Sequence, residues 1–180
     1  MAVTAAVVKE LRQRTGAGMM DCKRALVKAE GDLEQASELL RKAGQAKADK
    51  RAFRIAVEGR VVVRSDSASR RYVIAEINSE TDFVARDDNF GKFAESVTKM
   101  LLDAAPADVD ALMALKVGGQ TLQAARQALV TRMGENISVR RFKILETQRK
   151  VGSYVHMARI GVLVETDGGD EILVRDLAMQ

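Results

Sequence analysis

The hydrophobic pattern of this chain changes its period at Gly59, and this change constrains the fold more than any other feature. Before Gly59, apolar residues recur at the three- and four-residue spacing of amphipathic helices. After it they alternate, as in a strand that buries one face, with Val73, Ala75 and Ile77 on one side. Helical patterns then return between further strand patterns. The sequence therefore predicts an α+β protein with a helical N-terminal part and a core with antiparallel sheets.

The N-terminal part, residues 1–44, is predicted to form three short helices. Thr4 can cap the first helix, and the second begins near Met19. Asp32 can cap the third helix, which Gly44 is expected to end. Four apolar residues of the third helix are expected to face inward: Ala36, Leu39, Leu40 and Ala43. A basic, alanine-rich segment follows, and we expect it to be partly helical.

The rest of the chain contains one pattern twice: a hairpin, an acidic turn and a helix. The predicted elements are a hairpin of 61–64 with 72–77, helices near 90–101, 109–115 and 122–132, a strand at 137–144, a hairpin of 153–156 with 160–165, and a helix from 170. The echo predicts two related α+β subdomains, the second incomplete because the sequence ends at Gln180. We expect domains at 1–54, 55–144 and 145–180.

Composition narrows the classes of function. The net charge is +4, and basic residues gather between Arg41 and Arg71, which could suit RNA or an acidic protein surface. A solvated helix end is the simpler interpretation, and five Phe, two Tyr and no Trp provide no stacking platform for bases. We therefore expect no direct nucleic-acid partner.

The N-terminus lacks the pattern of a secretory signal, no apolar run is long enough to span a bilayer, and Cys22 is the only cysteine. These features favour the cytoplasm and no membrane partner.

The side chains that usually carry catalysis are scarce. His156 is the only histidine, and it lies far along the chain from Cys22. The sequence contains neither the glycine-rich loop of dinucleotide-binding proteins nor the GxxxxGK[ST] loop that binds nucleotide phosphates. The pair Asp87-Asp88 is typical of a helix start, and Glu80 with Asp82 lacks a third metal ligand. We therefore expect no enzyme, no metal and no cofactor.

The stretch EINSETDFVAR, residues 76–86, contains the residue on which the function depends. An alternating strand stops at Thr81-Asp82-Phe83, and a helical pattern then begins. A phenylalanine at such a corner is either a plug over the helix end or a wedge offered to a partner. The residues alone leave both alternatives open.

Two long stretches, LRQRTGAGMMDCKRAL (11–26) and EINSETDFVAR, closely resemble the signatures of the bacterial translation elongation factor Ts family. GENISVRRF and GSYVHMARIGVLV resemble further blocks of that family, so the likeness extends over essentially the whole chain. The resemblance implies a guanine-nucleotide exchange factor that binds elongation factor Tu with GDP and promotes GDP release. It also implies a three-helix N-terminal domain like a ubiquitin-associated domain, followed by two similar α+β subdomains.

The resemblance also implies which residues meet the partner. Asp82 and Phe83, between Thr81 and Val84, match the pair that intrudes on the GTPase near its magnesium and switch region. The resemblance implies five further contact positions. They are Met20 and Lys23 in the N-terminal part, Met133 and Gly134 at the end of a predicted helix, and His156 in the last predicted hairpin. A structural explanation also exists for Lys23, for Met133 with Gly134, and for His156. These are a solvated helix lysine, a core methionine beside a glycine helix stop, and a histidine at a hairpin tip.

Three features complicate this interpretation. Met157 stands where the family pattern usually has glycine. Most family members also continue well past DLAMQ, and we expect this chain to be truncated. The alternative function is therefore a GTPase- or RNA-binding module without exchange activity. Finally, Arg140 and Arg141 are neighbours on a predicted strand, so one of them is expected to point inward or to an edge in a structural role.

Overall fold

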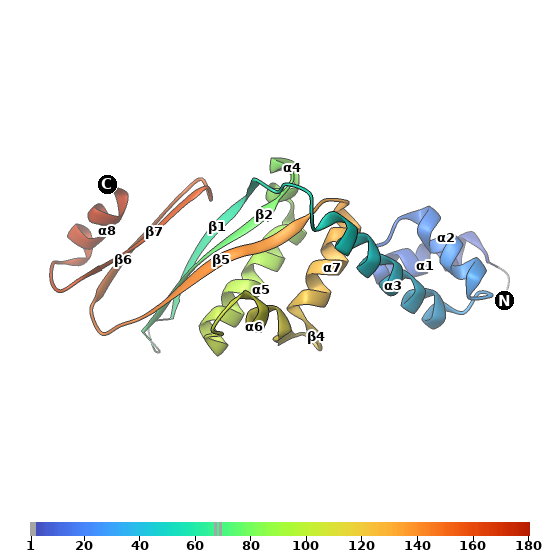
Figure 1. Cartoon of the computed structure of the whole chain (residues 1–180), viewed down its shortest axis with the longest axis horizontal. Coiled ribbons are helices and arrows are strands. Elements are labelled where there is room, and N and C mark those ends of the chain that lie inside the picture. Colours follow the sequence, from blue (N-terminus) through green and yellow to red (C-terminus); the bar gives the residue numbers. More distant parts are fainter. Residues whose placement is uncertain (1–2, 67, 69) are drawn as a thin grey trace.

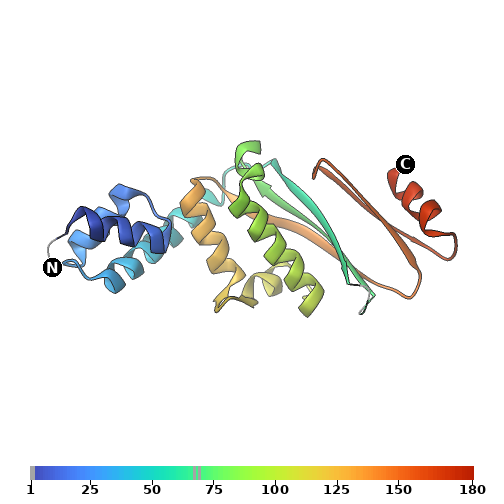
Figure 2. The same cartoon turned by 180° about the vertical axis from the view of Figure 1, so that it is seen from behind.

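The computed structural model describes residues 3–66, 68 and 70–180. The molecule is elongated, with a bundle of helices at the N-terminal end, a sheet with helices on one face in the middle, and a hairpin with a helix at the C-terminal end (Figure 1). Figure 2 shows the same order from behind. The prediction of an α+β fold with small antiparallel sheets is confirmed. Within the described residues, no helix combines the length and apolar character needed to cross a membrane.

The N-terminal bundle consists of α1 (Ala5–Thr15), α2 (Met19–Lys28) and α3 (Leu33–Arg51). As predicted, the side chains of Thr4 and Asp32 accept hydrogen bonds from backbone N–H groups in the first turns of α1 and α3. Such caps satisfy donors that have no partner within the helix. The bundle buries a small cluster of apolar residues that includes Val8, Leu11, Cys22, Ala25, Leu26 and Ala36.

The prediction that Gly44 ends the third helix is wrong, because α3 continues to Arg51. A Cβ atom at Gly44 would lie 2.7 Å from Oγ1 of Thr131, which belongs to α7 (Leu122–Met133). The glycine therefore permits two helices to pack closely instead of stopping one of them. Local sequence cannot distinguish these two uses of glycine, because the second depends on a residue far along the chain.

The inward face predicted for α3 is also partly wrong. Ala36 is buried in the N-terminal cluster, but Leu39 and Ala43 are exposed. Further along, Ala48 is buried in a second and larger apolar cluster, the main core, which includes Ile77, Phe90 and Val130. There α3 packs on α7. One continuous helix thus contributes to both clusters. The division into domains at 1–54, 55–144 and 145–180 stays a prediction.

The central sheet has the order β1-β2-β5 and is antiparallel, with β1 (Glu58–Asp66), β2 (Arg71–Ser79) and β5 (Ile137–Glu146). The predicted first hairpin and the later strand are thereby confirmed. Val73, Ala75 and Ile77 are buried beneath α5, as their alternation predicted. The connecting elements are α4 (Asp82–Arg86), α5 (Asp88–Ala104), α6 (Val109–Ala114), β3 (Lys116–Val117) and β4 (Gln120–Thr121).

A bulge in β5 changes the directions of its two neighbouring arginines. Glu76 on β2 pairs with Arg141, and the next residue of β2 pairs with Val139, so Arg140 is the extra residue. Both arginines bind the Glu76 carboxylate, at 2.8 Å for Arg140 and 2.7 Å for Arg141, and both remain exposed. Of the two directions predicted for one of these arginines, the inward one is therefore wrong. The other alternative agrees with the structure, because β5 is an edge strand of the sheet and both arginines have a structural role in binding Glu76. Burial raises the pKa of Glu76, but its hydrogen bonds with the two arginines outweigh this and lower the pKa overall.

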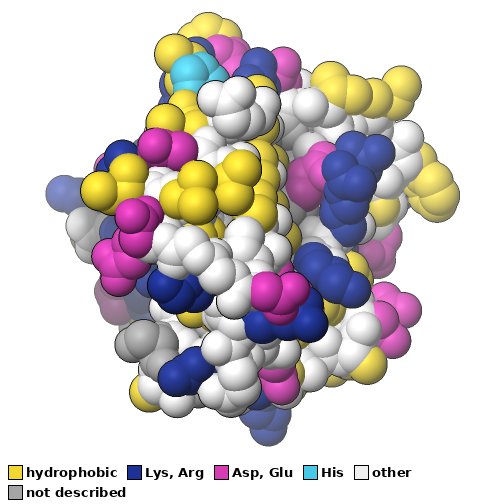
Figure 3. Space-filling model, turned by 90° about the vertical axis from the view of Figure 1, so that its left-hand side faces the viewer, with side chains coloured by type: hydrophobic (Ala, Val, Ile, Leu, Met, Phe, Trp, Pro, Cys, Tyr) yellow, Lys and Arg dark blue, Asp and Glu magenta, His cyan; other side chains and the backbone are white. Residues whose placement is uncertain are grey.

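The C-terminal part consists of β6 (Lys150–His156), β7 (Ile160–Thr166) and α8 (Glu171–Met179), which confirms the predicted hairpin and helix. A Cβ atom at Gly161 would lie 2.4 Å from Val61 Cγ1, so β7 packs against the face of β1 that the helices leave uncovered. Hydrophobic side chains gather on this end of the molecule (Figure 3). Those exposed on α8 are Ile172, Leu173, Leu177 and Met179.

Candidate functional site

The Phe83 ring lies on the surface, with 82 % of the residue exposed. It belongs to α4, a helix of five residues that begins where β2 ends. The next residue, Val84, is 8 % exposed and belongs to the main core. The short helix is therefore anchored by Val84 while the aromatic ring points outward. The alternative that Phe83 plugs its own core is wrong.

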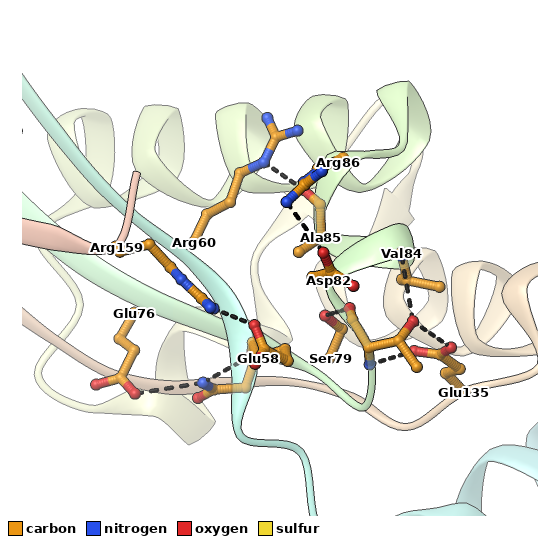
Figure 4. Close-up of polar contacts among 12 residues, drawn as sticks. Glu58, Arg60, Glu76, Ser79, Asp82, Val84, Ala85, Arg86, Glu135 and Arg159 are labelled. Atoms are coloured by element: carbon orange, nitrogen blue, oxygen red, sulfur yellow. Dashed lines mark hydrogen bonds and ion pairs between the residues drawn. The ribbon is translucent and has the colours of Figure 1, made fainter. Parts of the chain in front are cut away.

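Three polar interactions shape α4 (Figure 4). The Thr81 hydroxyl caps the helix by accepting a hydrogen bond from the Val84 N–H at 3.4 Å. At the other end, the Arg60 guanidinium donates to the carbonyl oxygen of Ala85. The Asp82 carboxylate pairs with Arg86 at 3.0 Å, one turn later. Because the Arg86 side chain is 79 % exposed, this pair is weak, and the Asp82 charge can exchange it for another partner.

Two residues that the sequence did not single out bind the loop before α4. The Glu135 carboxylate accepts hydrogen bonds from the Thr81 N–H at 2.9 Å and from its hydroxyl at 2.7 Å. The Asn136 N–H donates to the Glu80 carboxylate at 2.6 Å. Glu135 and Asn136 lie in the block GENI. No local pattern relates them to the loop before α4, because Thr81 and Glu135 are 54 positions apart in the sequence.

One side of α4 borders a hollow of about 270 Å³. Asp82 and Arg86 line it from α4, and Met157 and Arg159 line it from the turn between β6 and β7. That turn is fixed to β1, because Arg159 pairs with Glu58 and the Val61 N–H donates to the carbonyl oxygen of Ala158 at 2.7 Å. The fold thus brings the end of the second hairpin to the same corner as Phe83.

His156 immediately precedes this turn and is exposed. Its Nδ1 atom lies 3.0 Å from the Tyr154 hydroxyl, so the two side chains share a hydrogen bond. The pairing orients the imidazole ring on the surface beside the turn. The sequence prediction placed His156 at a hairpin tip, and the structure agrees.

A larger cleft of about 1020 Å³ lies between the N-terminal bundle and the helices α5 and α7, and Asp87, the residue that follows α4, lines it. Phe93, Leu129 and Met133 contribute apolar side chains to it. Its cationic residues are Lys9, Arg12, Arg14, Lys92 and Arg132. Among the described residues that line the cleft, Asp87 is the single carboxylate. Hydrogen bonds from the Asn89 side chain and backbone lower the pKa of Asp87, which keeps it ionised.

The remaining candidate residues lie around this cleft or beyond it. Met133 lines the cleft, and Gly134 ends α7 in a left-handed conformation, as predicted for a helix stop. Met20 is 61 % exposed near the start of α2, and Lys23 is exposed one turn later on the same helix face. Asp82 and Phe83 thus lie on α4, His156 precedes the turn that lines the hollow beside α4, and Met133 lines the larger cleft. Met20 and Lys23 come from the N-terminal bundle.

Comparison with known proteins identifies the family to which this chain belongs. The family described as "Elongation factor TS" matches residues 80–180. The chain belongs to the elongation factor Ts family. Elongation factor Ts of Halorhodospira halophila is 54 % identical over 179 residues, covering 99 % of this chain and 62 % of the relative. Elongation factor Ts of Arthrospira platensis is also 54 % identical over 179 residues, covering 99 % of this chain and 72 % of the relative.

The match with the elongation factor Ts family includes every part of the candidate site. The family match begins at Glu80, just before α4, and includes Glu135 and the turn that contains Met157. The relatives' alignments also include the N-terminal bundle with Met20 and Lys23, because they cover 99 % of the chain. This chain nevertheless spans only 62 % of the length of the first relatives that it matches.

Met157 has a left-handed backbone, with φ of 50°, at the position where the resemblance to elongation factor Ts leads us to expect glycine. Its side chain packs little, because 82 % of the residue is exposed. We expect Met157→Gly to raise the free energy of unfolding by about 0.5–1 kcal/mol, since relief of the backbone strain exceeds the added entropy of glycine. Urea denaturation measures this change. Met157→Ala is the matched control, because it keeps the strain, and an equal gain in that variant would contradict the explanation.

Proposed function

We propose that this chain binds elongation factor Tu in its GDP-bound form and accelerates the release of GDP. In this proposal Phe83 is the wedge, and Asp82 is the charge that disturbs the magnesium region of the partner. The two hollows beside α4 receive neighbouring parts of the partner, and His156, Met133, Met20 and Lys23 provide further contacts. The process belongs to translation elongation in the cytoplasm.

The physical basis of exchange is a difference in affinity. An inserted ring separates groups that otherwise close over the nucleotide, but it shifts the population only if it binds the open state more tightly than the closed one. The magnesium ion and the phosphate-binding loop neutralise the phosphates of GDP. Disturbing both therefore weakens GDP. No covalent bond forms or breaks, so the function requires no catalytic side chain.

The observation that carries the proposal is the outward position of the Phe83 ring on a turn held by its neighbours. A large aromatic ring that is 82 % exposed gains free energy by entering a partner's pocket. The cleft is suited to a partner with an acidic surface, because five cationic side chains surround one carboxylate.

The test is the rate at which elongation factor Tu releases a fluorescent GDP analogue, measured with increasing amounts of this chain. We expect a release rate that rises and saturates as the chain binds. Binding is measured separately by titration calorimetry. Binding without acceleration would contradict exchange and favour the alternative of a docking module without exchange activity.

Salt dependence distinguishes the RNA-binding form of that alternative. Contacts between cationic side chains and phosphates weaken steeply as ionic strength rises, because bound counterions are released. Apolar docking of Phe83 depends much less on salt. We expect association with elongation factor Tu to survive moderate salt, and we expect binding to a single-stranded RNA oligonucleotide to be weak at all salt concentrations.

A further inference from the structure

We infer that Glu135 is a positioning residue that holds Phe83 in the direction required for exchange. This inference rests on the proposed function and extends it to a residue that makes no contact with the wedge itself. Its starting point is the weakness of α4 as an isolated element. A helix of five residues cannot maintain itself, since forming the first turn fixes more dihedral angles than its hydrogen bonds repay. The direction of Phe83 must therefore be imposed from outside α4.

Glu135 imposes it through the residue that starts the helix. Each of the two carboxylate oxygens of Glu135 accepts one hydrogen bond from Thr81, from the N–H at 2.9 Å and from the hydroxyl at 2.7 Å. The same hydroxyl oxygen accepts from the Val84 N–H and so caps α4. Because the Thr81 hydroxyl donates its hydrogen bond to the Glu135 carboxylate, the lone pairs of the hydroxyl oxygen remain available to accept the cap. Glu135 thus fixes both the backbone and the side chain of the capping residue.

A second set of hydrogen bonds joins the same two loops, and here the loop of Glu135 and Asn136 provides the donors. The Asn136 N–H donates to Glu80 at 2.6 Å, and the Asn136 side chain donates to the carbonyl oxygen of Arg54 at 2.8 Å. Glu80 also pairs with Arg54 at 3.5 Å. Asn136 is 5 % exposed, so these bonds are shielded from water. Residues 135 and 136 connect the end of α7 with the start of β5, and they bind the α4 loop to this framework.

A merely stabilising role for Glu135 makes a different prediction from a positioning role. Loss of stability lowers the amount of folded chain, and it acts in the same way whether or not Phe83 is present. Loss of position acts only through Phe83. Variants at both sites, alone and together, therefore separate the two roles.

The experiment measures GDP release from elongation factor Tu at saturating concentrations of the full chain and of the variants Glu135→Ala, Phe83→Ala and the double variant. We expect Glu135→Ala to lower the maximal rate about tenfold or more, as misplacement of an interacting group does, while the half-saturating concentration changes less. In the Phe83→Ala background, Glu135→Ala should have no further effect. Glu135→Gln keeps the shape and one acceptor oxygen, and it should be intermediate.

Glu165→Ala is the matched control, because the Glu165 carboxylate accepts a hydrogen bond from a threonine hydroxyl, that of Thr147, away from α4. It should retain the parent rate. Equal losses from Glu135→Ala with and without Phe83, or a parent rate for Glu135→Ala, would overturn the inference. A parent rate for Phe83→Ala would instead overturn the proposed wedge function.

A measurement that needs no partner distinguishes a failure of the positioning role of Glu135 from a failure of the proposed wedge function of Phe83. Amide hydrogen exchange of residues 81–86 should be faster in Glu135→Ala than in the parent chain, while exchange in β2 stays unchanged. Unchanged protection of residues 81–86 would overturn the positioning role whatever the GDP-release rates are.

Discussion

Phe83→Ala is expected to remove most of the acceleration of GDP release while leaving the fold intact. Truncating a central aromatic side chain at an interface costs about 2–4 kcal/mol. This corresponds to a loss of about 30- to 1,000-fold in the stimulated rate at subsaturating concentrations. The ring is 82 % exposed, so the free energy of unfolding should change by no more than about 0.5 kcal/mol. Stopped-flow release of a fluorescent GDP analogue and urea denaturation measure the two effects.

The chain offers a matched control for this prediction. Phe53, in the segment between α3 and β1, is 93 % exposed. If Phe83 acts as a specific wedge, Phe53→Ala should retain a rate close to that of the parent. A loss as large as that of Phe83→Ala would mean that exposed aromatic surface in general drives docking. Parent-like stimulation by Phe83→Ala would show that the wedge assignment is wrong.

Gly59→Ala is expected to lower the free energy of unfolding more than an alanine substitution at another glycine with positive φ. Gly59 has φ of 141°, a conformation that side chains rarely allow. A Cβ atom there would lie 2.1 Å from the carbonyl oxygen of Ile77 and 2.7 Å from the Cα atom of Asn78. Both atoms belong to the backbone of β2, which pairs with β5 on its other side and cannot easily move. Strain and overlap together should cost at least about 3 kcal/mol.

Urea denaturation tests this prediction, because a midpoint shift at constant slope reports the loss of stability. Gly118→Ala is the control: Gly118 has φ of 59°, but a Cβ atom there would meet nothing within 4 Å. This variant carries the cost of the backbone conformation without overlap, about 1 kcal/mol. Equal losses in the two variants would contradict the role of close packing against β2.

Many secondary-structure elements could be predicted from the sequence because their signals are local. Caps such as Thr4, Asp32 and Asp170 bind N–H groups three residues further on. The alternation of Val73, Ala75 and Ile77 predicted which face of β2 is buried. The site was predicted less completely. Phe83 and Asp82 were identified by resemblance to a family, and nothing in the residues themselves decided between a plug and a wedge.

The remaining features depend on partners far away in the chain. Gly44 lies within a helix because Thr131 packs against it, although its local sequence resembles a helix end. Arg140 and Arg141 both reach Glu76 because β5 has one extra residue opposite β2 at that point. In each case the deciding contact crosses more than sixty positions of sequence. No window of neighbouring residues contains that information.

By itself the sequence determined the types of the elements, most of their boundaries and the class of the fold, because hydrogen-bonding caps and hydrophobic periods act over a few residues. Only the tertiary structure decided that the Phe83 ring lies outside the core, that the turn with Met157 lies across a hollow from Asp82 and Arg86 of α4, and that Glu135 holds the loop between β2 and α4. The physical reason is that a side chain's direction at a corner is set by whichever groups pack and bond there, and those groups come from strands and helices that only folding brings together.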